Sequence, residues 1–155
     1  MRVAVSQFAT SFNVQDNLAT CIRMINKAAE CKPTLIVLPE YCNTHFFSHP
    51  LCNTTSFYVD HEQAWNEALS IDGDFLKRIS EQATKHDCYI VINVTLRRDL
   101  SRDLLNNKQD DTTQATAKSN ISVTTCLFSP LGKLIHQVDK HALTGHESDF
   151  FISAS

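Results

Sequence analysis

The sequence predicts an α/β fold, because short apolar segments follow amphipathic ones in a repeating order along the chain. Residues 34–38 form an apolar run directly after a segment with helical periodicity. Such a run is typical of a parallel strand buried on both faces. The order recurs where a second helical pattern leads into the apolar residues 88–95. We therefore expect βα units with right-handed crossovers, within one domain of 155 residues.

The first third of the chain reads as strand, helix, strand. Residues 2–8 are predicted to form a buried strand, since two β-branched valines alternate there with small residues. Asp16 or Asn17 is expected to cap the helix that follows, and Pro33 to end it. The apolar positions of this helix, at spacings of four, three and four, are Leu18, Ile22, Ile25 and Ala29. The second strand, 34–38, is closed by Pro39.

The rest of the chain repeats the alternation and then changes to hairpins. Residues 41–60 are expected to be irregular, a helix to span about 74–86 and a strand 88–95. Residues 97–119 are strongly polar without an apolar period, so we expect an exposed, flexible insert there. Two β runs, 120–128 and 133–138, flank the turn Ser129-Pro130-Leu131-Gly132 and predict a hairpin. Residues 139–155 read as loop.

Composition argues against several classes of function. The 14 Lys+Arg and 17 Asp+Glu leave a net charge of −3, without the basic surplus that phosphate neutralisation needs. We therefore expect no nucleic-acid partner. Only three glycines occur in the chain, too few for a glycine-rich phosphate loop. We expect no nucleotide or other cofactor.

The ends of the chain and its cysteines bear on the compartment. The N-terminus lacks the apolar stretch of a secretory signal, and no apolar run approaches the ~20 residues that span a bilayer. We therefore expect no membrane association. The six cysteines are scattered along a mid-sized chain without an export signal, which favours reduced thiols. These observations together predict a cytoplasmic protein.

Two charged residues stand at the ends of predicted strands. Glu40 follows the strand 34–38, at the sheet edge where ligands of α/β folds bind, and a carboxylate held there can act as a general base. Lys140 follows the last predicted strand and can hold an oxyanion by its fixed charge. Each also has a simpler interpretation, because a solvated loop glutamate and a surface lysine beside Asp139 would look the same.

The motifs taken together resemble the carbon–nitrogen hydrolase (nitrilase) superfamily over most of the chain. They are the opening strand Val3-Ala4-Val5-Ser6-Gln7, the helix start Asn17-Leu18, the block Leu35-Ile36-Val37-Leu38-Pro39-Glu40, the strand Ile90-Val91-Ile92-Asn93, Asn120, the turn at 129–132, and Lys140-His141-Ala142-Leu143. Each motif is short, but their order and spacing are fairly specific. The polar insert at 97–119 is longer than the family usually carries.

The resemblance implies both a fold and a chemistry. The implied fold is a four-layer αββα sandwich, and the implied site is a Glu–Lys–Cys triad acting on amides, N-carbamoyl compounds or nitriles. By this analogy Glu40 is the general base and Lys140 stabilises the tetrahedral intermediate. Glu147 lies, by a looser match, where many members carry a second glutamate that orients the site. Members usually act on small molecules and associate into homo-oligomers.

The nucleophile is where the chain departs from the family pattern. The family cysteine lies beyond the lysine, whereas the last cysteine here, Cys126, precedes Lys140. We therefore expect residues 1–155 to form the N-terminal, incomplete part of the sandwich, with the catalytic cysteine beyond this chain. Cys42, two residues after Glu40, is the thiol nearest the predicted site; we expect it to be buried and inert.

Two further interpretations remain open from the residues alone. The chain can be a naturally truncated, non-catalytic member that acts through binding or oligomerisation, since half a sandwich leaves an apolar face exposed. It can also be a small zinc-binding module, because one loop contains the spacing C-x2-H-x3-H-x2-C. The four potential ligands are Cys42, His45, His49 and Cys52.

Overall fold

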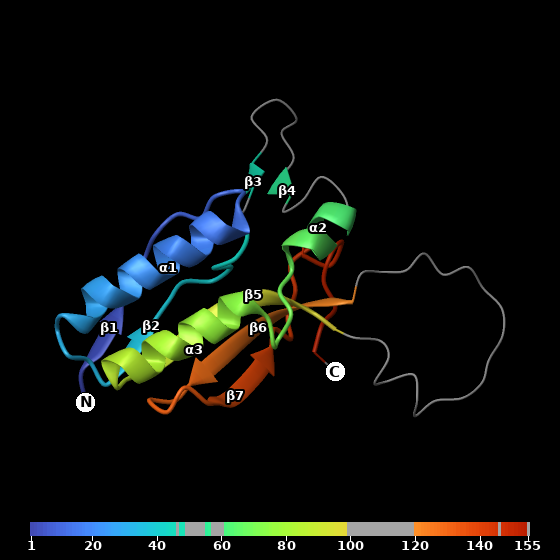
Figure 1. Cartoon of the computed structure of the whole chain (residues 1–155). Helices are drawn as coiled ribbons and strands as arrows, with labels where there is room; N and C mark the ends of the chain where they lie inside the picture. The colour runs from blue at the N-terminus through green and yellow to red at the C-terminus, as the bar shows by residue number, and fades with distance from the viewer. Residues whose placement is uncertain (46, 49–54, 57–60, 99–119, 146, 155) are drawn as a thin grey trace, which may run out of the picture.

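A mixed sheet with two long helices on one face forms the body of the protein. The computed structural model describes residues 1–45, 47–48, 55–56, 61–98, 120–145 and 147–154. Within them, five strands lie in the order β1-β2-β5-β6-β7, the first three parallel and the last two antiparallel. Their bounds are β1 Val3–Val5, β2 Leu35–Val37, β5 Tyr89–Arg97, β6 Ile121–Phe128 and β7 Leu134–Asp139. Both long helices, α1 Val14–Ala29 and α3 Asp74–His86, lie side by side over the same face (Figure 1).

The first helix begins earlier than the sequence predicts. Its N-cap is Asn13, whose Oδ1 accepts the Gln15 N–H at 2.8 Å and the Asp16 N–H at 3.1 Å. The prediction that Asp16 or Asn17 caps this helix is therefore wrong. Asp16 lies in the first turn, where a carboxylate favours the helix dipole. Asn17 is buried, and its side chain bonds to a different part of the chain.

The predicted βα alternation is confirmed, and its core lies between the helices and the sheet. α3 has the predicted bounds and ends at Asp87, which adopts the left-handed conformation. Fully buried side chains from both layers form this core, among them Ile25 of α1, Ile79 of α3 and Ile90 of β5. Each such aliphatic side chain contributes roughly 1.5–3 kcal/mol by leaving water.

The opposite face of the sheet is apolar and partly open. Cross-strand register places Val5 opposite Val37, and Val37 opposite Val91, so these side chains share one face. Val5 is 76% exposed and Val138, farther along the sheet, is 51% exposed. A sheet covered by helices on one side and apolar on the other corresponds to half of a layered sandwich.

Other elements depart from the prediction in detail. β1 is shorter than residues 2–8, and β5 extends to Arg97, which was assigned to the polar insert. Residues 99–119 of that insert lie outside the described residues. Sequence periodicity does not predict the short helix α2 (His61–Glu67) or the two-residue strands β3 (Phe47–Ser48) and β4 (Thr55–Ser56). In the final segment, predicted as loop, Ile152 forms an isolated bridge with Ser122.

No helix among the described residues is long and apolar enough to cross a membrane.

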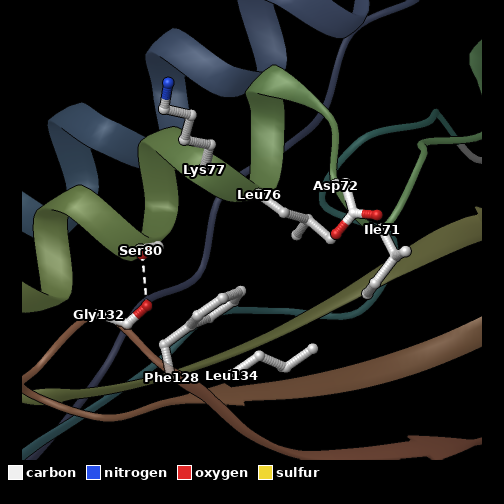
Figure 2. A pocket seen from close by; sticks show the side chains of 8 residues that line it. All are labelled: Ile71, Asp72, Leu76, Lys77, Ser80, Phe128, Gly132 and Leu134. Carbon is white, nitrogen blue, oxygen red and sulfur yellow. Dashed lines mark hydrogen bonds between the residues drawn. The ribbon is translucent and has the colours of Figure 1, made fainter.

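The hairpin between β6 and β7 is confirmed, and it docks on α3. Gly132 has a φ of 71°, and its carbonyl accepts the Ser80 hydroxyl at 2.6 Å (Figure 2). The hairpin and α3 border a groove of about 290 Å³, whose apolar walls include Leu76 and Phe128. None of the three predicted catalytic residues lines this groove.

Alanine at Gly132 is expected to lower the free energy of unfolding by about 2 kcal/mol. The left-handed backbone disfavours a side chain. An added Cβ would also lie 2.7 Å from Thr84 Oγ1 and 3.0 Å from Ser80 Oγ. Gly145→Ala is the control, because nothing lies within 4 Å of a Cβ there. Urea unfolding of both variants measures the difference, and equal stabilities would contradict this account.

Candidate active site

The loop after β2 places Glu40 at the edge of the sheet. Leu38 N–H still donates to Val91 O at 3.0 Å, and Cys42 N–H donates to Asn93 O at 2.9 Å. Between these bonds the chain bulges out of the sheet, and the Glu40 side chain is 51% exposed. The sheet-edge position predicted from the sequence is therefore observed.

Lys140 reaches the same place from the end of β7. Its backbone N–H donates to Val123 O at 2.7 Å, which continues the β6–β7 pairing by one residue. Its Nζ lies 2.9 Å from Glu40 Oε1 and 2.6 Å from Glu147 Oε1. The ammonium also stands 5.8 Å from the centroid of the Tyr41 ring, within cation–π range. One lysine thus bridges two carboxylates from distant parts of the chain.

Glu147 is the buried member of this cluster, with 3% of its surface exposed. Its Oε2 accepts the Thr144 N–H at 2.6 Å, and its Oε1 accepts the Tyr41 hydroxyl as well as Lys140. Burial acts to raise the pKa of Glu147, but the hydrogen bonds from Lys140, Thr144 and Tyr41 outweigh it and lower this pKa to about 2. The carboxyl is therefore ionised throughout the neutral range.

Lys140 keeps its positive charge because its pKa is raised. Its partial burial acts to lower its pKa, but the hydrogen bonds and charges of Glu147 and Glu40 outweigh this and raise it. A protonated lysine held between two carboxylates is a fixed positive charge, and such a charge can stabilise an oxyanion. The half-exposed Glu40 is accessible for proton exchange with a bound molecule. The structure thus brings together the three residues that the sequence singled out.

Sequence reasoning missed three side chains that organise this region, Tyr41, Asn43 and Asn93. Asn93 is a polar residue inside an otherwise apolar strand, which is a usable signal in retrospect. Asn43 is fully buried and its amide bonds to Thr95 Oγ1 at 2.8 Å. The position of Asn43 in an apparently irregular loop offered no such signal.

Cys42 is buried, as expected, and does not have the environment of a reactive thiol. Its Sγ–H donates to Pro39 O at 3.1 Å, and its side chain is 0% exposed. Contact with the Cys21 thiol and burial raise the pKa of Cys42 well above its usual value. A thiol so disposed is a poor nucleophile.

The proposed zinc ligands are described only in part, because His49 and Cys52 lie outside the described residues. The Cys42 thiol bonds to Pro39 O, and His45 Nδ1 lies 2.7 Å from Thr10 O. In the described part of the chain no three His, Cys, Asp or Glu side chains are grouped as metal ligands would be.

Comparison with known proteins identifies the family. The family model of carbon–nitrogen hydrolases matches residues 2–153. The chain belongs to this family. Solved structures of nitrilase-superfamily proteins share its fold over part of their length, so the chain has a partial nitrilase-like fold. No curated protein sequence gives a significant match.

Three structural neighbours show how much of the family domain is present. Saccharomyces cerevisiae Nit3 is 20% identical with a TM-score of 0.71, and the match covers 100% of this chain and 49% of Nit3. A carbon–nitrogen hydrolase from Helicobacter pylori is 13% identical with a TM-score of 0.68, covering 100% and 45%. A Nesterenkonia amidase is 17% identical with a TM-score of 0.65, covering 100% and 48%. The chain therefore spans about half the length of these proteins.

Proposed function

We propose that this chain is the N-terminal portion of a hydrolase that cleaves non-peptide carbon–nitrogen bonds in small molecules. The observation that carries the proposal is the Lys140 ammonium, which lies 2.9 Å from Glu40 and 2.6 Å from Glu147. These are the residues that the family resemblance predicted. The substrate classes are amides, N-carbamoyl compounds and nitriles.

The proposed mechanism divides the chemistry between this chain and a cysteine beyond Ser155. Glu40 takes the proton of that cysteine, and the thiolate attacks the carbon of the substrate. For an amide or N-carbamoyl compound, Glu40 returns the proton to the nitrogen, the carbon–nitrogen bond breaks, and water hydrolyses the thioester that remains. For a nitrile, the thiolate adds to the triple bond as the nitrogen takes the proton, and water then displaces ammonia and hydrolyses the thioester. Lys140 balances the negative charge that develops on the tetrahedral intermediate, while Glu147 holds Lys140 in place. In support of a cysteine nucleophile, a structure of a glutamate-to-glutamine mutant of the neighbouring Nesterenkonia amidase shows the result of Michael addition of acrylamide at the active-site cysteine of that protein.

The test uses a form of the protein that contains this chain together with a downstream cysteine. Ammonia release from representative amides, N-carbamoyl compounds and nitriles is measured. Glu40→Gln and Lys140→Ala are each expected to lower kcat/KM by roughly 10²-fold or more. Glu30→Gln and Lys133→Ala, at exposed positions, are matched controls that should retain activity. Hydrolysis that survives both site substitutions would refute the assignment.

A second candidate function is favoured by the exposed apolar face that includes Val5 and Val138. On this proposal the chain is non-catalytic and acts through binding or self-association in the cytoplasm. Size-exclusion chromatography with light scattering distinguishes the two. A stable monomer that binds no apolar dye would argue against the binding function, and ammonia release by the longer form would favour hydrolysis.

A further inference from the structure

The pairing of β2 with β5 becomes irregular where Glu40 leaves the sheet. In a regular parallel ladder, successive donors to one strand come from residues two apart on its neighbour. Here the donors to Val91 O and Asn93 O are Leu38 and Cys42, at 3.0 and 2.9 Å. The donors are therefore four residues apart in the chain after β2, while their acceptors on β5 are two residues apart. Two extra residues are accommodated in the bulge at 39–41, and Glu40 lies within it.

Asn93 satisfies the backbone of this bulge with its side chain. Its Oδ1 accepts the Tyr41 N–H at 3.0 Å, in addition to the Cys42 N–H that its own carbonyl accepts. Its Nδ2 donates to Thr125 Oγ1 at 3.0 Å on β6, which fixes the orientation of the amide. An aliphatic residue in its place would supply no acceptor for the Tyr41 amide.

Tyr41 adopts an unfavourable backbone conformation, with a φ of 58°. A bulky residue occupies this left-handed region only when its surroundings hold it there. The two hydrogen bonds that Asn93 accepts from the Tyr41 and Cys42 N–H groups supply that restraint. The resulting side-chain direction takes the Tyr41 hydroxyl to Glu147 Oε1, the oxygen that also accepts Lys140.

We propose that Asn93 is a positioning residue, which holds the bulge so that Glu40 meets Lys140 and the Tyr41 hydroxyl meets Glu147. For catalysis this inference rests on the proposed function, which it deepens. Asn93 itself touches none of the three charged groups in the described hydrogen bonds. It acts through the backbone of Tyr41, from the adjacent strand.

The test compares Asn93→Ala with the wild-type chain by NMR. Tyr41 amide exchange is expected to accelerate by at least ~10-fold, because its acceptor is gone. The pKa of Glu147, from ¹³C carboxyl titration, is expected to rise by about one unit as the Tyr41 hydroxyl donates less often. Asn26→Ala is the control, because it removes a hydrogen-bonded amide at the partly exposed surface of α1 and not from the bulge, so both readouts should stay close to wild type.

Two further variants keep the test decisive. Asn93→Gln carries the same amide one methylene farther out and should reproduce both changes even if the alanine variant fails to fold. Asn93→Asp retains an acceptor for the Tyr41 amide and should restore its protection from exchange. Wild-type exchange and an unchanged pKa of Glu147 in the Gln variant, or equal changes in Asn26→Ala, would overturn the proposal. Neither readout needs turnover, so failure here is distinct from failure of the hydrolase assignment.

Discussion

Replacement of Glu147 by glutamine is expected to lower the free energy of unfolding near pH 7 by up to about 3 kcal/mol. The pKa of Glu147 is lowered from 4.5 to about 2 by its hydrogen bonds in the folded protein. A pKa difference of this size between the folded and unfolded states corresponds to a contribution of about 3 kcal/mol to the free energy of unfolding. The residue is 3% exposed, so solvent screens this interaction little.

The sign of the effect defines its pH dependence. A folded-state pKa below the unfolded value stabilises the protein fully above the unfolded value of 4.5, and the contribution is lost as the pH falls through about 2. The difference in the free energy of unfolding between wild type and Glu147→Gln should therefore become smaller as the pH falls across this range. Urea unfolding at several pH values measures it, with the exposed Glu30→Gln as control. A gap that does not change with pH would contradict the ionised, hydrogen-bonded state assigned to Glu147.

Asn43→Ala is expected to destabilise the protein by about 3–5 kcal/mol. Asn43 is 0% exposed, and its Nδ2 donates to Glu67 O at 2.9 Å and to Thr95 Oγ1 at 2.8 Å. Its Oδ1 accepts the Thr95 N–H at 2.9 Å. Removing the amide leaves a buried donor and a buried acceptor without hydrogen-bond partners, and each costs about 1–3 kcal/mol. It also leaves a small cavity.

The control for this prediction is Asn26→Ala. Asn26 Oδ1 also accepts side-chain hydrogen bonds, from Lys85 Nζ at 2.9 Å and from His86 Nε2 at 2.8 Å. However, Asn26 lies at the partly exposed surface of α1. Water can replace these bonds, so a loss below about 1 kcal/mol is expected. Chemical unfolding monitored by circular dichroism measures both variants. Equal losses would show that burial of the Asn43 network adds little.

Most of the fold could be predicted because burial leaves a local pattern. Leu18, Ile22 and Ile25 recur at helical spacing, and residues 34–38 form a continuous apolar run. The helix start was misplaced because Asn13, Asp16 and Asn17 are all suitable caps, and the choice depends on which side chain the core requires. Asn17 is buried in the core, where its Nδ2 donates to Asn43 O at 3.0 Å, so it does not cap the helix.

Some residues of the candidate site could likewise be predicted from the sequence, and others could not. Chain order and residue type point to Glu40 and Lys140, each at the end of a predicted strand, and the family resemblance adds Glu147 by a looser match. The conformation of Tyr41 and the role of Asn93 depend on a hydrogen bond between residues 52 positions apart, and the ion pair of Glu40 with Lys140 spans 100. Contacts of that separation have no local signature, because they arise only when β2, β5 and β7 come together in one sheet.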